Sequence, residues 1–428
     1  MQHARARRGL TGAVTLVVAA ALAVVGCTPA PEPDPTSSPA PSPSTAPVAY
    51  SGPAMFIGDE IEAFLLTPDE ITALLPDVSE VSEPIDGTEM YADGSGTQYD
   101  PEECIALYLE QQLRAVGART VEWRIGDTDE LGPGALRVVQ LGSVGQAEER
   151  MDQLLSAAEN CASFTSDGDS TFTDVATELR GDVRAMAGVL RTDATPYQWH
   201  AFYGYVQVGN VLVQLVHEFS GDTTFASDDV AKALADRAEE AHAALIEKLT
   251  AEPPVPAEPE KVGADVALAD WPIVFGAVGP IALGDDAREA ADRVPGAEVT
   301  QTTGESDLLH VGPPGSASTL RLRFDDEGAV ESIDVGAQHF TDDERPDGAL
   351  LPSAGDVRIG DPMSKAMAAF PEGSSMRIIS AGIDLYMIAD RDGQVIWFTT
   401  AIEPGGEAAA KIYSMTVENA ALWTYYRL

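Results

Sequence analysis

The pattern of apolar and polar positions predicts helices in the first half of the chain. The sequence TPDE at 67–70 has the order of a helix start, with a hydroxyl cap, proline at the first position and glutamate at the third. The sequence DPEE at 100–103 predicts a second start, which places Cys104 in the first turn. Apolar residues spaced by three and four predict further helices after Ser143 and over about 227–249.

Runs in which apolar and polar residues alternate predict strands between these helices. Runs at 121–125 and 135–141 are typical of strands, and runs at 198–208 and 211–219 flank Gly209-Asn210, which predicts a hairpin with a two-residue turn. The expected fold class is therefore α+β. We expect an antiparallel sheet with packed helices in the N-terminal domain.

The two faces of this hairpin differ in character. One face is apolar except for His200 and His217, which we interpret as satisfied strand residues because no third metal ligand has suitable local spacing. The other face combines aromatic side chains with polar side chains that can form hydrogen bonds, which is typical of a small-molecule or glycan cleft. The alternative is that a helix covers this face and makes it core. The candidate ligand-binding residues are Trp199, Tyr203, Tyr205, Gln207, Gln214 and Glu218.

The C-terminal region contains an internal repeat at an offset of 76 residues. In each copy we expect the aspartate to cap a short helix that the proline ends. A hairpin is predicted after each helix, at 319–335 and at 384–399, so the region is expected to be a tandem repeat of a helix plus an antiparallel β-meander. The matched positions are Gly284-Asp285 with Gly360-Asp361, Ala290 with Ala366, and Pro295 with Pro371.

The first fifty residues predict export and lipid anchoring. A basic start is followed by an apolar run from Leu10 to Val25, which is short of the roughly 20 residues that span a bilayer, so a cleaved signal peptide is expected. The sequence VVGC at 24–27 resembles a bacterial lipobox, whose cysteine carries lipid. Cys27 is therefore the predicted lipidation site. The alternative is a secreted protein with a chance cysteine.

Composition shifts divide the chain into five predicted parts. Eight prolines between Thr28 and Pro47 predict a stiff polyproline-II tether of about 60 Å if fully extended. A second proline-rich and charged break follows the helix that ends near residue 249. The predicted parts are a signal peptide (1–26), a tether (27–53), a sensor-like α+β domain (54–250), a linker (251–265) and a domain with two repeats (266–428; repeats at about 281–345 and 357–425).

Charge and cysteine count narrow the function classes. The formal net charge is -43, and removal of the signal's three arginines makes it more negative, which argues against nucleic acid and against anionic lipid as partners. If Cys27 is lipidated, Cys104 and Cys161 remain as a pair in an oxidising compartment, where we expect them to form a disulfide.

Motifs that carry catalysis are not found in the sequence. There is no G-x-S-x-G, no phosphate-binding glycine loop and no H-E-x-x-H. The sequence DRDG at 390–393 looks like a fragment of a calcium loop but lacks the closing glutamate, and we interpret it as a hairpin turn. We expect no catalytic residue, metal or cofactor.

The order of elements from about Phe56 to Leu249 resembles the extracellular sensor domain of PknH-type mycobacterial kinases, which also occurs in actinobacterial lipoproteins. The resemblance rests on the opening LLTPDEITALL helix, Cys104 in an early helix, the Val139-Gln140 strand before a helix ending at Asn160-Cys161, the aromatic hairpin and the final helix. It implies an α+β fold with a cleft for an unidentified ligand. The family commonly has two disulfides, whereas one pair is available here. The C-terminal repeats look like the helix-then-meander units of outer-membrane assembly lipoproteins and β-lactamase inhibitor proteins.

The expected function is that of a lipid-anchored, non-enzymatic sensor or ligand-binding lipoprotein on the extracytoplasmic face of the cell membrane. Its partner would be an unknown small molecule or cell-envelope component, with protein contact through the C-terminal repeats. One alternative is a cell-envelope scaffold that binds proteins only. Another is a hydrolase with an unrecognised site.

Overall fold

The computed structural model describes residues 49–90, 98–108, 115–126, 132–166, 168–194, 197–255, 262–263, 265–301, 307–312, 320–337, 347–402 and 409–423. They belong to the compact unit Pro47–Leu428. The unit Met1–Ala46 lies outside the described residues, as do Cys27, the predicted signal peptide and most of the predicted tether.

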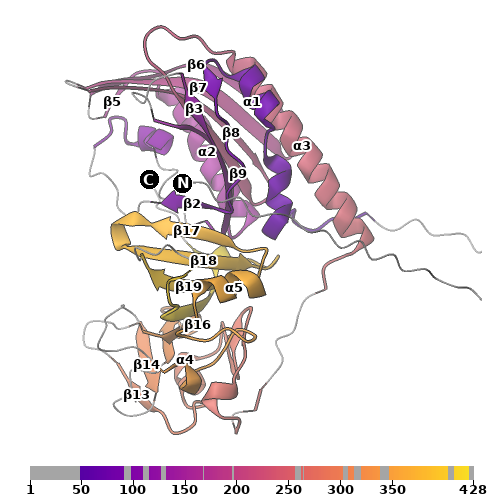
Figure 1. The fold of residues 1–428 in the computed structure, drawn as a ribbon, viewed down its shortest axis with the longest axis vertical. Helices are drawn as coiled ribbons and strands as arrows, with labels where there is room; N and C mark the ends of the chain where they lie inside the picture. The colour runs from indigo at the N-terminus through magenta and orange to yellow at the C-terminus, as the bar shows by residue number, and fades with distance from the viewer. Residues whose placement is uncertain are drawn as a thin grey trace, which may run out of the picture. The chain divides into compact units, whose positions relative to one another are not determined.

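The first half of this unit is built on an eight-stranded sheet of order β1-β3-β4-β9-β8-β7-β6-β5 (Figure 1). Every neighbouring pair in it is antiparallel. Its strands are β1 (Val78–Ser79), β3 (Gly117–Ile125), β4 (Gly134–Gln140), β5 (Phe164–Thr165), β6 (Asp169–Arg180), β7 (Val183–Ala194), β8 (Tyr197–Val208) and β9 (Val211–Glu218).

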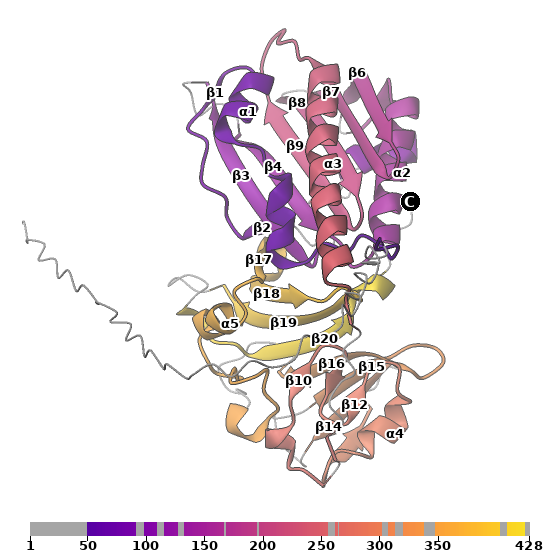
Figure 2. The same cartoon turned by 90° about the vertical axis from the view of Figure 1, so that its right-hand side faces the viewer.

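Helices cover both faces of this sheet. On one face α3 (Ser227–Ala251) buries the predicted apolar stripe, and Figure 2 shows it running along the strands together with α1 (Pro68–Leu74) and η1 (Gly58–Phe64). On the other face lie α2 (Val144–Asn160) and the 3-10 helix η2 (Glu102–Tyr108). Thr67 and Ser143 cap α1 and α2 as expected. None of the helices in the described ranges is both long and apolar enough to cross a membrane.

The hairpin of β8 and β9 has the predicted register. Val208 lies opposite Val211, and Phe202 lies opposite His217. Gly209 has a φ of 56°, as the two-residue turn requires. The alternation of side chains between the two faces is therefore also as predicted.

The sequence pattern assigned no element to β6 and β7, although each has 12 residues. Much of β6 is exposed, so its side chains do not alternate cleanly between apolar and polar. A register shift between Thr173 and Ala176 interrupts the strand further.

The expected disulfide is present between Cys104 and Cys161, whose Cα atoms lie 5.8 Å apart. Cys104 lies in η2, a 3-10 helix where an α-helix was expected, and Cys161 follows the last residue of α2. Both cysteines are fully buried with Met151 and Leu154. The bond thus joins the two elements that cover one face of the sheet.

The second half is built on a nine-stranded sheet of order β13-β14-β15-β16-β20-β19-β18-β17-β2 and a three-stranded meander. The two repeats share the large sheet, and in the described ranges each contributes four strands and one α-helix. Both predicted hairpins are present. The first repeat contains α4 (Ala287–Ala291), β13 (Glu298–Thr300), β14 (Leu308–Gly312), β15 (Leu320–Phe324) and β16 (Val330–Gly336). The second contains α5 (Met363–Ala369), β17 (Ser374–Ile378), β18 (Ile383–Ala389), β19 (Gln394–Ala401) and β20 (Ser414–Asn419). The meander is β10 (Ile273–Val274), β11 (Ala277–Val278) and β12 (Ile281–Ala282), and the short 3-10 helices are η4 (Leu268–Asp270), η5 (Gly348–Leu350), η6 (Ile379–Ala381) and η8 (Ala420–Leu422).

The predicted helix caps in the repeats are wrong by one residue. Asp286, and not Asp285, caps α4, and Pro362 occupies the cap position of α5. Asp285 accepts a hydrogen bond from the backbone N–H of Ala282 at 2.9 Å, and Asp361 accepts the equivalent bond from Arg358 at 2.8 Å. The repeated aspartate therefore closes the turn before the helix.

One strand of the first half belongs to the sheet of the second half. The strand β2 (Gly87–Met90) pairs in parallel with β17. The architecture is α+β throughout, as predicted. The division of the chain at 251–265 into separately folding domains stays a prediction.

Candidate functional site

The predicted ligand-binding face of the hairpin lies beneath α2. Tyr203 and Tyr205 are buried with Met151 and Leu154 of that helix, and their rings stack with centroids 5.6 Å apart. Gln207 and Gln214 are 1% and 4% exposed. Ligand binding by this face stays a prediction, and it would require α2 to move.

Several polar groups of this face have hydrogen-bond partners within the protein. Gln207 donates to the carbonyl of Gly209 at 2.9 Å, and Gln214 accepts from Arg137 at 3.2 Å. At the half-buried edge, Trp199 Nε1 donates to Glu218 at 3.1 Å. These contacts are typical of a buried face and its boundary and not of an open cleft.

The two histidines of the opposite face have separate partners. Trp123 Nε1 donates to His217 Nδ1 at 3.1 Å, and burial lowers the pKa of His217 to about 4. His200 Nε2 lies 3.6 Å from Asp193 Oδ1. Within the described residues, no group of three or more His, Cys, Asp or Glu side chains is arranged to hold a metal ion.

A pocket of about 560 Å³ lies between the first half of the chain and the second repeat. We call it the junction pocket. Its volume falls within the roughly 300–1,000 Å³ typical of small-molecule sites. Its walls are formed by the start of η1, the facing ends of β3 and β4, the β10 segment, the end of α5, and parts of β17, β18 and β19. Its larger apolar lining residues include Ile57, Val116, Ile273, Phe370, Met387 and Ile396.

Gln140 is a buried polar side chain in the wall of this pocket, as is Ser374. It is 2% exposed, and its buried Nε2 has no hydrogen-bond partner in the described part of the chain. It lies opposite Gly117 in the β3–β4 register, and a Cβ at residue 117 would come within 2.5 Å of its Oε1. The missing side chain of Gly117 therefore makes room for the amide in the pocket wall.

Two acidic residues also line the junction pocket. Burial raises the pKa of Asp390 above the ordinary aspartate value, although its Oδ1 accepts backbone N–H bonds from Asp392 and Gln394, each at 2.9 Å. Glu372 lies at the exposed rim. Within the described part of the chain, no lysine, arginine or histidine lines this pocket.

The hairpin turn holds one wall of the pocket in place. Asn210 accepts a hydrogen bond from the backbone N–H of Phe56 at 2.7 Å and donates to the carbonyls of Phe56 and Leu141. A Cβ at Gly209 would lie 2.1 Å from the carbonyl oxygen of Ala54. The turn therefore fixes the segment that enters the pocket at Ile57.

An ion pair joins η1 to the turn that carries Asp390. Both terminal guanidinium nitrogens of Arg391 bind Glu60, Nη1 at 2.9 Å, and Nη1 also donates to the carbonyl of Met55. Lys248 binds the same carboxylate at 2.7 Å. Burial by itself would raise the pKa of Glu60, but the hydrogen bonds from Arg391 and Lys248 lower it below its ordinary value.

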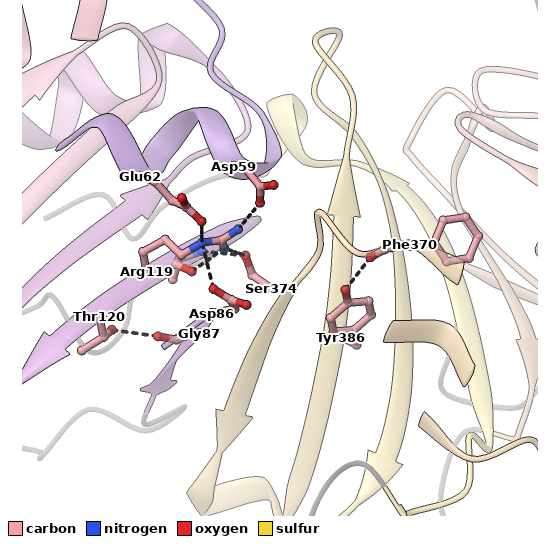
Figure 3. Close-up of polar contacts among 10 residues, drawn as sticks. Asp59, Glu62, Asp86, Gly87, Arg119, Thr120, Phe370, Ser374 and Tyr386 are labelled. Atoms are coloured by element: carbon pink, nitrogen blue, oxygen red, sulfur yellow. Dashed lines mark hydrogen bonds and ion pairs between the residues drawn. The ribbon is translucent and has the colours of Figure 1, made fainter. Parts of the chain in front are cut away.

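A second charged cluster surrounds Arg119 of β3 (Figure 3). Its guanidinium group is 1% exposed and lies 2.8 Å from Asp59, 3.4 Å from Glu62 and 3.2 Å from Asp86. It also donates to Ser374 of β17 at 2.9 Å. The cluster thus links η1, the segment before β2 and the second repeat beside the junction pocket.

Phe370 forms part of the pocket wall, and a contact within the second repeat holds it in place. The hydroxyl of Tyr386 donates to the carbonyl of Phe370 (Figure 3). A Cβ at Gly373 would lie 2.4 Å from the Tyr386 ring, so glycine leaves the space that this ring occupies. Phe370 follows the last residue of α5, which the predicted helix stop at Pro371 locates correctly.

Sequence reasoning missed this site because its walls come from residues 57 to 396. The sequence predicts that Val139-Gln140 belongs to a strand before a helix, and that pattern does not indicate a binding site. The DRDG sequence at 390–393 is the predicted hairpin turn, with Gly393 at a φ of 78°. Its Arg391 contacts a helix more than 300 positions earlier.

Comparison with known proteins gives distant structural neighbours. No family model matches the sequence, and no curated protein matches it. The extracellular domain of PknH from Mycobacterium tuberculosis is similar over 47% of this chain and 99% of its own, at 15% identity and a TM-score of 0.30. A putative uncharacterized protein (Rv0999 ortholog) from Mycobacterium smegmatis is similar over 44% of this chain and 97% of its own, at 11% identity and a TM-score of 0.26. These likenesses cover about half of the chain and are too weak to assign a function.

Proposed function

We propose that this protein is a lipid-anchored, non-catalytic lipoprotein of the extracytoplasmic face of the cell membrane that binds a small molecule in the junction pocket. The observation that carries the proposal is the apolar pocket whose wall contains the buried, unpartnered amide of Gln140. Buried polar groups are almost always hydrogen-bonded, so an exception facing a pocket favours a ligand there.

The proposed location rests on the first residues and on the cysteines. The short apolar run and the lipobox at 24–27 favour lipid on Cys27. The Cys104–Cys161 bond fits an oxidising, extracytoplasmic compartment. The proposal also agrees with the resemblance of residues 56–249 to a sensor-domain family, which implies a cleft for an unidentified ligand.

Contact with a protein partner through the repeats is a further part of this proposal. In the second repeat, Met376, Leu385 and Met387 pack against Leu141 and Ala147 of the first half. That face is therefore occupied. A protein partner would contact the first repeat.

The anchor is tested with Cys27→Ala. We expect the wild-type protein in the membrane fraction and the variant in the medium or the soluble extracytoplasmic fraction. Mass spectrometry of the wild-type N-terminal peptide should show a diacylglyceryl adduct on Cys27. Continued membrane association of the variant would contradict the proposed anchor.

The pocket is tested with a variant that fills it. Ala389 lines the junction pocket, whereas Ala244 is exposed on α3. We expect wild type and Ala244→Phe, purified from the cell envelope, to carry the same small molecule in native mass spectrometry. Ala389→Phe should retain its melting temperature and lose that molecule. An equal load on all three proteins would overturn the pocket as the binding site.

A further inference from the structure

We infer that the occupant of the junction pocket is an uncharged amphipathic molecule, with an apolar chain and a hydrogen-bonding oxygen that meets the amide of Gln140. This inference rests on the proposed function and adds the chemical class of the ligand. It follows from three properties of the pocket wall.

The first property is the charge of the lining. Asp390 and Glu372 are acidic, and none of the described residues that line the pocket is basic. The nearby guanidinium groups are bound elsewhere, Arg391 by Glu60 and Arg119 by three carboxylates. An anionic head group such as a carboxylate or a phosphate would meet repulsion without a counterion.

The second property is the environment of Asp390, which disfavours a cationic ligand. Its Oδ1 already accepts two backbone N–H bonds that hold the turn. A cation would also have to lose its own hydration in an apolar pocket.

The third property is the combination of an apolar lining with one amide. Aliphatic and aromatic side chains form most of the wall, which suits a hydrocarbon chain. Gln140 Nε2 is a donor, so an ester carbonyl or a hydroxyl oxygen would satisfy it. A buried donor left without a partner is costly, and a ligand that supplies the acceptor removes that cost on binding.

The test uses three probes with the same 12-carbon chain: 1-monolauroylglycerol, laurate and dodecylammonium. The protein is the chain from residue 27 with Cys27→Ala, which contains the whole compact unit Pro47–Leu428 and needs no detergent. Affinities are measured by titration calorimetry at pH 7.5, below the critical micelle concentration of each probe. We expect 1:1 binding of 1-monolauroylglycerol, and at least about tenfold weaker binding of both charged probes.

The role of the amide is tested with Gln140→Leu, and with Gln198→Leu on the exposed part of β8 as the matched control. We expect Gln140→Leu to weaken binding of 1-monolauroylglycerol about tenfold, while the ligand-free protein keeps or raises its melting temperature, because an unpartnered amide is replaced by an apolar group. The control should bind as the wild type does. A Gln140→Leu variant that melts lower and binds unchanged would show a structural role only, and would overturn the inference.

The remaining outcomes separate the two proposals. If laurate or dodecylammonium binds as tightly as the uncharged probe, and Ala389→Phe abolishes that binding, the pocket binds ligands but the inferred class is wrong. If no probe binds and Ala389→Phe carries the same envelope-derived molecule as the wild type, both the class and the pocket are overturned.

Discussion

The side-chain amide of Asn210 forms hydrogen bonds with both the backbone N–H and the backbone carbonyl of Phe56, at 2.7 and 3.2 Å. Asn210 is fully buried in the turn between β8 and β9, and it also donates to Leu141. A two-residue hairpin turn thus fixes a segment 154 positions away and positions one wall of the junction pocket.

Replacing Asn210 should destabilise the whole unit. Asn210→Ala leaves two backbone carbonyls and one backbone N–H without this partner, so we expect the free energy of unfolding to fall by about 2–3 kcal/mol. Urea denaturation followed by circular dichroism measures it. Asn160→Ala, at the exposed end of α2, should change it by less than about 0.5 kcal/mol. Equal effects of the two substitutions would contradict the role given to Asn210.

The contact between Glu60 and Arg391 should be energetically coupled. The two side chains are 15% and 17% exposed, and the contact is bidentate. In a double-mutant cycle with Glu60→Gln and Arg391→Met, we expect a coupling energy of about 1–2 kcal/mol. The exposed pair of Arg323 and Asp307 is the control, and its coupling should stay below about 0.5 kcal/mol. A Glu60–Arg391 coupling no larger than the control would show that the pair does not join the two halves.

Protonation of His217 should make stability depend on pH in a defined window. Its pKa is about 4 in the folded protein and ordinarily 6.5, so between these values the unfolded chain binds more protons. The stabilisation is therefore complete above pH 6.5 and is lost as the pH falls to 4, by about 3 kcal/mol. Protonation of Nδ1 would also break the bond from Trp123.

The variant His217→Gln isolates this contribution, because glutamine can accept from Trp123 without titrating. We expect its unfolding free energy to fall less steeply than that of the wild type between pH 6.5 and 4. Urea denaturation at half-unit intervals measures both slopes. Parallel slopes would show that His217 does not titrate differently in the folded protein.

The disulfide should contribute strongly to stability. It closes a loop with a sequence separation of 57, for which the chain-entropy model gives about 4 kcal/mol. We expect Cys104→Ala/Cys161→Ala to lower the free energy of unfolding by about this amount, as measured by urea denaturation. Reductant should shift the wild type toward the variant and leave the variant unchanged. A loss below about 1 kcal/mol would show that the bond is dispensable.

Local signals in the sequence predicted the elements that carry their own start and stop. The capping box at Thr67 and Glu70, the cap at Ser143 and the Gly-Asn turn act over a few residues, and each is present as predicted. The repeat was also visible, because its turn, helix and proline recur at a fixed offset. The strand β6 was missed, since an exposed and bulged strand does not alternate. The strand β7 was missed because it is buried on both faces and so shows no alternation either.

The candidate site could not be predicted in the same way. The aromatic hairpin face looked like a cleft because alternation shows which residues share a face but not what covers them. In the structure α2 covers it. Gln140 looked like the end of a strand, and only its position opposite Gly117 and beside the second repeat makes it a buried amide in a pocket wall.

The sequence by itself determined the α+β class, the hairpin register, the main helices, the repeat and the cysteine pair. Turns, helix caps and the spacing of apolar residues act over a few positions, and the cysteine pair follows by elimination. The tertiary structure alone decided that β2 joins the sheet of the second half, that Asn210 and Arg391 hold η1, and that a pocket forms between Gln140 and Asp390. Those contacts join residues hundreds of positions apart. Which distant groups meet depends on how whole sheets and helices pack, and no local pattern records that.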